Sequence, residues 1–242
     1  MSTKKPLIIA HRGAHTLAPE NTIAAGKLAL EMGASALEVD VRLCATGEVV
    51  LFHDNFLWHH FRQLKPVIFT GLDELREMRF NNLHSPDSDT ICTLDEFLEE
   101  FKGTVPLNLD VKTFMTDYFS LADALVKTVK RHNVMDQVWF SAFNPLFLLI
   151  FKRKFPEVRI GYLFRNMSWV HQNLDLLIKA EAWHVHYHLI NKAFLQKARR
   201  RGKEVYVWTI EDEATFKKML KYPFSGIITD ILIPPDVKDK NL

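Results

Sequence analysis

The stretch that runs from Ile8 to Asp54 opens with Ile8-Ile9-Ala10-His11-Arg12-Gly13-Ala14 and closes with Leu51-Phe52-His53-Asp54. Between these ends it contains Ala18-Pro19-Glu20-Asn21-Thr22 and Leu37-Glu38-Val39-Asp40-Val41-Arg42. Two histidines, an arginine and two alternating carboxylates therefore stand at the ends of short apolar runs. These are the side chains that cleavage of a phosphate ester with the help of a hard metal ion requires.

The two carboxylates lie in an apolar run that predicts a strand over Ser35–Val41. Because side chains alternate across a strand, Glu38 and Asp40 share one face while aliphatic side chains cover the other. Adjacent carboxylates repel each other and are costly to bury, and a cation such as Mg²⁺ or Ca²⁺ compensates them. Two other interpretations stay open, namely a solvated edge strand and ion pairs with Arg12 and Arg42.

The same alternation recurs in Leu107-Asn108-Leu109-Asp110-Val111-Lys112. Asn108, Asp110 and Lys112 share one face of this expected strand, and aliphatic side chains share the other. Asp110 is thus a candidate third acidic ligand, and Lys112 is a candidate partner for a phosphate oxygen. With the two earlier carboxylates, Asp110 predicts a site of three acids.

Several motifs together resemble the signature of the glycerophosphodiester phosphodiesterase family. They are His11-Arg12-Gly13, Pro19-Glu20-Asn21-Thr22, Glu38-Val39-Asp40, His53-Asp54, the strand at 107–112 (similar to the family's Asn-x-Glu-x-Lys), Val207-Trp208-Thr209 and Gly226-Ile227-Ile228-Thr229-Asp230. The resemblance runs from Leu7 to Asp230. It implies a TIM (β/α)₈ barrel, a divalent metal, and hydrolysis of glycerophosphodiesters to sn-glycerol 3-phosphate and an alcohol.

The resemblance also implies the metal ligands. One divalent cation, Mg²⁺ or Ca²⁺ with Mn²⁺ as a further candidate, is expected on Glu38, Asp40 and Asp110. Asp110 is one methylene shorter than the family's Glu, which leaves a contact through water open.

The remaining roles follow from charge and titration range. His11 and His53 are expected to divide the general acid and general base roles, because imidazole titrates near neutral pH. Arg12 and Lys112 add fixed positive charge for a phosphate. The resemblance implies that Trp208 forms a wall of the pocket. Which histidine is the base is left open, as is the choice between a cyclic phosphate intermediate and direct attack by water.

Strand-like runs alternate with helix-length segments along the chain, which favours a parallel α/β fold. The expected strands are 7–10, 35–41, 107–111, 138–141, 159–163, 183–187, 205–209 and 226–229. The expected helices are 22–32, 117–130, 145–154, 192–201 and 213–220, with a further helix after a capping box of Thr93 and Glu96. One barrel of ordinary size fills residues 1–242, so a single domain is expected, with its site at the C-terminal ends of the strands.

Residues 54–93 interrupt this alternation, and the resemblance places a small cap insertion there. The family usually has Leu-Asp-Arg-Thr-Thr where this chain has Leu57-Trp58-His59-His60-Phe61. The aromatic side chains either form a lid over the site or pack the cap onto the barrel. The departure at 57–61 leaves the contacts to the head group open. Glu211 and Ala142 stand where the family usually has Asn and Ser, which leaves the polar contacts at those two places open.

Composition excludes other classes of protein. The formal net charge is +2 and there is no basic block, so a nucleic-acid partner is not indicated. Cys44 and Cys92 are too few and too far apart for a zinc cluster. The absence of a signal-like start and of long apolar runs predicts a soluble cytoplasmic protein that acts on a small molecule, without stable membrane insertion. The oligomeric state is open.

Three histidines alternate along one expected strand, and two functions other than glycerophosphodiester hydrolysis stay open. The alternating His184, His186 and His188 permit a second metal site, although surface or hydrogen-bonded histidines are more common. One alternative function is a lysophospholipase D or sphingomyelinase-D-like enzyme, which the aromatic residues at 56–61 and the apolar helix at 145–151 favour. The other is a catalytically silent protein that binds glycerophosphate.

Overall fold

The computed structural model describes residues 5–80, 90–114, 117–166 and 168–232. Its strands are β1 (Leu7–His11), β2 (Ala36–Leu43), β3 (Val49–Leu51), β4 (Leu107–Val111), β5 (Val138–Ala142), β6 (Ile160–Phe164), β7 (Ala182–His186), β8 (Glu204–Ile210) and β9 (Gly226–Thr229). Its α-helices are α1 (Ile23–Glu31), α2 (Trp58–Phe61), α3 (Leu72–Glu77), α4 (Leu94–Phe101), α5 (Tyr118–Arg131), α6 (Pro145–Lys154), α7 (Trp169–Ile178), α8 (Lys192–Arg200) and α9 (Glu213–Met219). Two 3₁₀ turns are η1 (Val67–Phe69) and η2 (Tyr187–Leu189).

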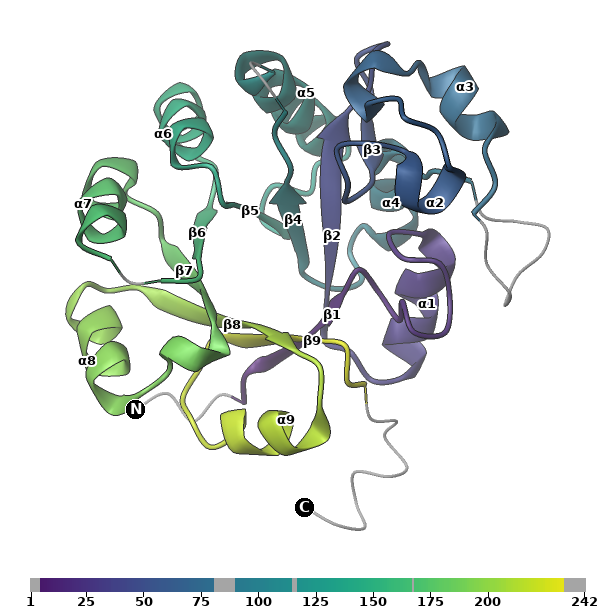
Figure 1. Ribbon diagram of the computed structural model, residues 1–242. Coiled ribbons are helices and arrows are strands. Elements are labelled where there is room, and N and C mark those ends of the chain that lie inside the picture. The colour runs from purple at the N-terminus through teal and green to yellow at the C-terminus, as the bar shows by residue number, and fades with distance from the viewer. Residues whose placement is uncertain (1–4, 81–89, 115–116, 167, 233–242) are drawn as a thin grey trace.

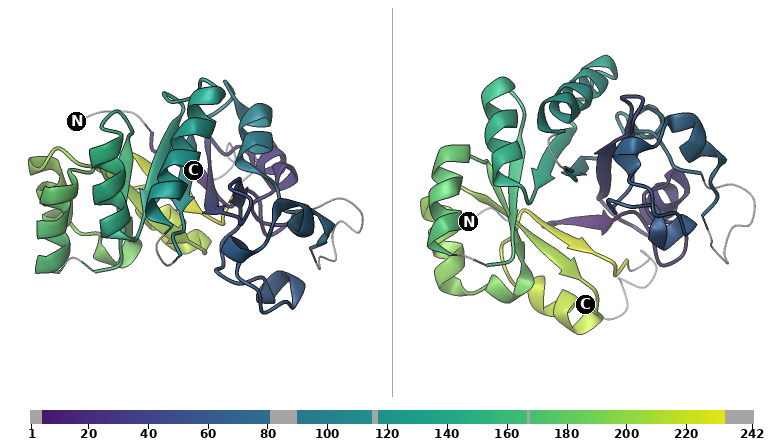
Figure 2. Two further views of the ribbon diagram at one scale, coloured as in Figure 1. Left: turned by 90° about the horizontal axis from the view of Figure 1, so that it is seen from above. Right: turned by 45° about the horizontal axis from the view of Figure 1, so that its top comes forward.

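In the described part of the chain, eight parallel strands close into a barrel. Their order is β1-β9-β8-β7-β6-β5-β4-β2, and β2 pairs again with β1. The helices lie outside the strands (Figure 1, Figure 2). The expected TIM (β/α)₈ barrel is confirmed.

The observed elements differ from the expected ones mainly in short or atypical segments. β3 was not expected, and it pairs antiparallel with the end of β2, Val41 lying opposite Leu51. α7 was not expected either, since Val170, Leu176 and Leu177 are exposed apolar residues that obscure an amphipathic pattern. The other boundaries lie within one or two residues, and Thr93 and Glu96 form the expected capping box.

Inward-pointing residues of seven of the eight barrel strands, all except β4, form an apolar floor. The floor consists of Ile9, Ala36, Trp139, Leu163, Ala182, Tyr206, Trp208 and Ile228. The next inward-facing residues on four of these strands, two positions further along the chain, are His11, Glu38, Ser141 and His184. The strand period of two therefore sets polar side chains above an apolar layer, at the C-terminal ends of the strands.

The segment between β3 and α4 contains α2, η1 and α3 and has an apolar cluster of its own. Leu57, Val67 and Leu75 are buried in it, and Phe61 packs against it. Phe56 and Trp58 are by contrast 42 % exposed. The packing interpretation is therefore correct for Leu57 and Phe61, while the lid over the site stays a prediction for Phe56 and Trp58. Residues 81–89 of the expected cap lie outside the described residues.

In the part of the chain that the structure describes, no helix has the length and apolar character needed to cross a membrane.

Gly161 on β6 provides a test of packing inside the barrel. A Cβ at this position would lie 2.4 Å from Cδ2 of His184, whose Nε2 accepts a hydrogen bond of 3.2 Å from Trp139. We expect Gly161→Ala to displace the imidazole and to lower the free energy of unfolding by about 1–3 kcal/mol, measured by urea denaturation. In the control Gly71→Ala, the new Cβ meets only Thr46 Cγ2, at 3.5 Å, and a change below about 1 kcal/mol is expected. Equal losses in both variants would contradict this account.

Candidate active site

A cavity of about 270 Å³ opens at the C-terminal ends of the strands. Its walls include six of the predicted site residues, His11, Arg12, Glu38, His53, Asp110 and Lys112. Trp208, also predicted, lines the same cavity from β8. The eighth, Asp40, is 1 % exposed and contacts Arg12 and Lys112. The structure thus brings all the predicted site residues together.

Asp40 is the most heavily bonded of the three acids. Its Oδ2 lies 3.0 Å from Arg12 Nε and accepts a hydrogen bond of 3.0 Å from the Asn21 amide. Its Oδ1 lies 2.9 Å from Lys112 Nζ. Burial acts to raise the pKa of Asp40, but the charges of Lys112 and Arg12 hold it well below its ordinary value. Asp40 is therefore an ionised carboxylate at the bottom of the site.

Glu38 and Asp110 are less well compensated. Glu38 accepts a hydrogen bond of 3.0 Å from the backbone N–H of Arg12, and burial together with the charge of Asp40 raises its pKa to about 8. Burial also raises the pKa of Asp110, although its Oδ2 pairs with Lys112. Among the described residues, the buried Oδ1 of Asp110 has no hydrogen-bond partner. These two acids leave room for a further positive charge.

The ligand atoms of Glu38, Asp40 and Asp110 lie within 4.8 Å of one another and are all buried. Two cationic side chains, Arg12 and Lys112, lie beside these three carboxylates. Arg12 also forms an ion pair with Glu20, at 2.9 Å. An oxygen-only set of this kind suits a hard divalent ion. The unpartnered carboxylate oxygen and the raised pKa of Glu38 show that the residues present fit such an ion.

The loop after β1 has the backbone that this arrangement requires. Arg12 and Asn21 have φ angles of 56° and 58°, in the left-handed region. Gly13, at φ 77°, lies so close to α1 that a Cβ would fall 2.6 Å from the backbone of Ala25. The Asn21 side chain both donates to the Asp40 carboxylate and accepts from its backbone N–H, at 2.9 Å. These bonds stabilise the strained turn next to the acids.

The interpretation that paired the strand acids with arginines is correct only for Arg12. Arg42 instead donates hydrogen bonds to the backbone carbonyls of His53, at 2.9 Å from Nε, and of Lys112, at 3.4 Å from Nη1. Burial lowers the pKa of Arg42 to about 10. Arg42 thus ties together the two segments that present His53 and Lys112.

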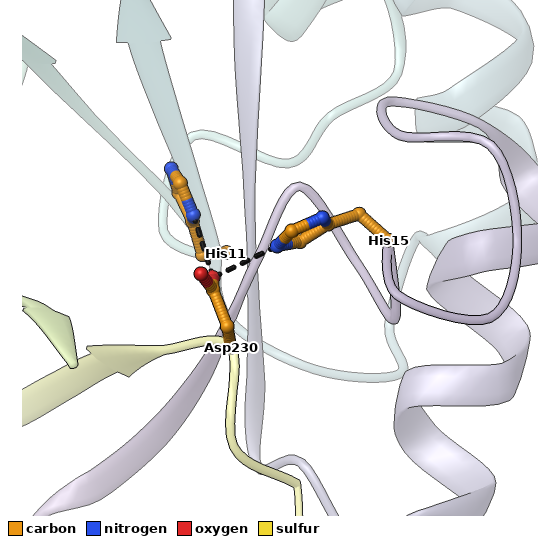
Figure 3. Close-up of side chains that lie close together, drawn as sticks. All are labelled: His11, His15 and Asp230. Atoms are coloured by element: carbon orange, nitrogen blue, oxygen red, sulfur yellow. Dashed lines mark hydrogen bonds and ion pairs between the residues drawn. The ribbon is translucent and has the colours of Figure 1, made fainter. Parts of the chain in front are cut away.

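His11 is oriented by the carboxylate of Asp230, which directly follows the last barrel strand. Its Nδ1 lies 2.8 Å from Asp230 Oδ1 (Figure 3). Burial acts against ionisation of Asp230, but the bonds from His11 and His15 hold its pKa below the ordinary value. Because an ionised carboxylate only accepts hydrogen bonds, the proton of neutral His11 is on Nδ1 and its Nε2 has a free lone pair. Burial alone would lower the pKa of His11, yet the Asp230 bond and the charge of Glu38 raise it.

His53 has a similar partner. Its Nδ1 lies 2.8 Å from Oδ1 of the neighbouring Asp54, and the side chain is 37 % exposed. Each predicted catalytic histidine therefore has a carboxylate on Nδ1, which leaves Nε2 available for a proton transfer.

Trp208 is surrounded by other aromatic and cationic side chains. Phe143 meets its ring edge to face at 5.3 Å, and the Arg165 guanidinium lies 5.4 Å from the ring centroid. Trp208 is thus a wall of the cavity, as expected. The described residues that line the cavity do not include Phe56 or Trp58 of the cap.

The three alternating histidines do not form a metal site in the described structure. His188 lies in η2 and not on the strand, because β7 ends at His186. His184 is fully buried, bonded to Trp139, and stacks on Tyr206 at 4.7 Å between ring centroids. Burial lowers its pKa to about 3. The interpretation as ordinary hydrogen-bonded or surface histidines is correct.

Four side chains around the site were given no role by sequence reasoning. Asp230, Asn21 and Glu20 were quoted only as parts of motifs, and His15 was not singled out. Asp230 is 219 residues from His11, so their contact left no local signal. The one available hint was that Asp230 directly follows an apolar strand run.

Comparison with known proteins agrees with this geometry. Residues 11–232 match the glycerophosphoryl diester phosphodiesterase family. The chain is 30 % identical over 231 residues to a glycerophosphodiester phosphodiesterase of Caldanaerobacter subterraneus subsp. tengcongensis, covering 93 % of this chain and 94 % of that one.

Solved structures give the same result. A phosphodiesterase of Oleispira antarctica in complex with the product sn-glycerol-3-phosphate is 28 % identical, with a TM-score of 0.86 and coverage of 94 % of both chains. A glycerophosphodiester phosphodiesterase of Thermotoga maritima is 26 % identical, with a TM-score of 0.77 and coverage of 94 % of this chain and 95 % of that one. The chain therefore belongs to the glycerophosphoryl diester phosphodiesterase family, whose members are phosphoric diester hydrolases.

Proposed function

We propose that this protein hydrolyses glycerophosphodiesters to sn-glycerol 3-phosphate and an alcohol, with one divalent cation and two histidines. The observation that carries the proposal is the meeting of Glu38, Asp40 and Asp110 beside two carboxylate-oriented histidines in one cavity. The bound product of the Oleispira antarctica relative supports glycerol phosphate as the part of the substrate that this cavity accepts.

Glu38, Asp40 and Asp110 would hold the cation, with Mg²⁺ or Ca²⁺ favoured over softer ions because all three ligands are oxygens. When bound, the ion supplies a Lewis acid that stabilises negative charge on a non-bridging phosphate oxygen. Arg12 and Lys112 add fixed positive charge at the same end of the cavity. Trp208 would confine the glycerol part of the substrate.

The two histidines would carry the protons. A hydrolysis needs one group that accepts a proton from the attacking oxygen and one that donates a proton to the leaving alcohol. His11 and His53 line the cavity together, and each has its Nδ1 bonded to a carboxylate. Asp230 and Asp54 would then stabilise the imidazolium that forms when Nε2 takes up a proton.

A lysophospholipid is a second candidate substrate on the same barrel. Leu17, Phe56 and Trp58 are exposed apolar side chains, at 51 %, 42 % and 42 %. Such side chains favour contact with an acyl chain. We propose the cap, residues 54–93, as the region where this choice would be made.

We propose glycerol and lipid metabolism in the cytoplasm as the setting. Cys44 and Cys92 are buried free thiols in the described structure, which suits a reducing compartment.

Turnover should depend on a divalent ion. We expect a chelator to abolish product formation without unfolding the chain, and Mg²⁺, Mn²⁺ or Ca²⁺ to restore it. The measurement offers glycerophosphocholine, glycerophosphoethanolamine and lysophosphatidylcholine to the stripped and reloaded protein and identifies the products, with circular dichroism as the folding control. Full turnover after stripping would refute the carboxylate site, and product from lysophosphatidylcholine alone would favour the second candidate substrate.

Glu38 and Glu20 should respond in opposite ways to the same substitution. In chelator at neutral pH, Glu38→Gln should raise the free energy of unfolding by about 1–3 kcal/mol, because the raised pKa of Glu38 means that folding without the ion must protonate this carboxylate, and the amide removes that cost. The variant should also lose stabilisation by Mg²⁺.

The matched control is Glu20→Gln. Burial acts to raise the pKa of Glu20, but His60 and Arg12 lower it to about 2, so this carboxylate is well paired. Its loss should reduce stability by about 1–2 kcal/mol. Urea denaturation with and without Mg²⁺ measures both variants, and a loss of stability in both would contradict the assignment of Glu38.

Replacing either proton carrier should lower turnover far more than substrate binding. We expect His11→Ala and His53→Ala each to reduce kcat by about a hundredfold or more. The control His188→Ala, an exposed histidine that does not line the described cavity, should keep normal turnover. Steady-state kinetics on the best glycerophosphodiester provide the measurement. Near-normal kcat in His53→Ala would exclude the two-histidine mechanism.

A further inference from the structure

Two histidines converge on a single carboxylate oxygen beside the cavity. His11 Nδ1 lies 2.8 Å and His15 Nε2 lies 2.9 Å from Oδ1 of Asp230. The residues come from the end of β1, the loop before α1 and the residue after β9, and their side chains point toward one another (Figure 3). The two imidazole rings are 5.7 Å apart between centroids and nearly perpendicular, at 87°.

This geometry offers three donor atoms from three separate segments. The ligand atoms of His11, His15 and Asp230 lie within 4.8 Å of one another. Their side chains are 19 %, 25 % and 16 % exposed, so an ion can enter from solvent and keep an open position. Two imidazole nitrogens and one carboxylate oxygen form the ligand set of open zinc sites.

The cluster differs in chemistry from the acidic site. Glu38, Asp40 and Asp110 offer oxygens only, whereas this cluster offers two nitrogens and one oxygen. Hard ions such as Mg²⁺ select the first set, and Zn²⁺ or Co²⁺ binds the second more tightly.

We propose that His11, His15 and Asp230 form a second metal site, for a borderline divalent ion such as Zn²⁺, and that its occupation inhibits turnover. The inhibition rests on the proposed role of His11. An ion bound to Nδ1 takes the place of the proton there, so the ring proton must move to Nε2. The Nε2 lone pair that a general base needs is then lost, and the neutral ring cannot become the imidazolium that a general acid needs.

His15 makes this proposal testable without changing the reaction site. It is not among the described residues that line the cavity, and its loop is held by the hydrogen bond of 2.9 Å from Ala14 N–H to the Ala25 carbonyl. In His15→Gln, the amide can still donate to Asp230, but the imidazole ligand is gone. His15→Ala is the second variant, should the amide retain some affinity.

The binding experiment uses Co²⁺ as a visible probe, because its absorption reports nitrogen ligation. The intact protein is titrated with Co²⁺ at saturating Mg²⁺, which occupies the oxygen site. We expect one equivalent to bind to wild type and the affinity to fall by about tenfold or more in both His15 variants. The control His188→Ala removes an exposed histidine outside the cluster and should bind like wild type.

The activity experiment adds Zn²⁺ at the same Mg²⁺ concentration. Zn²⁺ should inhibit wild type and His188→Ala equally, and excess Mg²⁺ should not relieve the inhibition. In His15→Gln, the inhibition constant for Zn²⁺, measured relative to the turnover of that variant without Zn²⁺, should rise by about tenfold or more.

The outcomes separate the two proposals. Equal Co²⁺ affinity in wild type and both His15 variants would overturn the metal site. Binding that depends on His15 but leaves turnover unchanged would overturn the inhibition. If no glycerophosphodiester is hydrolysed, the proposed function fails, and the Co²⁺ titration still decides the metal site.

Discussion

The site depends on keeping the carboxylate of Asp40 ionised where water hardly reaches it. Arg12, Lys112 and Asn21 all bond to this one side chain, which is 1 % exposed. A buried charge is tolerated only when it is paired and hydrogen-bonded. Asp40 therefore constrains the loop that bears Arg12 and Asn21, as well as the end of β4 at Lys112. Two left-handed residues in that loop are held in place by the same bonds.

The ion pairs of Asp40 also explain why the pKa values of the neighbouring Glu38 and Asp110 are raised. Arg12 and Lys112 are largely engaged with Asp40, Glu20 and Asp110, so little positive charge is left for Glu38. Glu38 and Asp110 are therefore the carboxylates of this cluster with the least charge compensation. Burial of Glu38 with so little compensation costs stability, and such a cost is common at functional sites.

The barrel strands hold the site residues in place more rigidly than a loop alone could. An apolar floor fills the interior, and the next inward residue on several strands reaches the cavity from a rigid support. The histidines are held in the same manner, one by Asp230 after β9 and the other by Asp54 after β3. The two histidines therefore lie around the same cavity as Glu38 and Asp110, and this cavity is built by strands far apart in the chain.

Much of this arrangement could be predicted from the sequence, because its physical causes are local. The period of two at Glu38 and Asp40, and again at Asn108, Asp110 and Lys112, is a property of any strand, so each shared face was predictable. Helix starts at Thr22 and Thr93 followed from side chains that bond the first free N–H groups. By contrast α7, with exposed apolar residues, and the three-residue β3 lacked a periodic signal.

Only the tertiary structure decided which polar residues share a partner. The sequence by itself determined the barrel, the acidic strand faces and the two catalytic candidates, since strand period, helix caps and motif order express them locally. It could not show that His11 and His15 share Asp230, that Arg42 binds backbone carbonyls rather than acids, or that His184 bonds to Trp139. Those contacts join segments that meet only when the barrel closes, so no spacing along the chain records them.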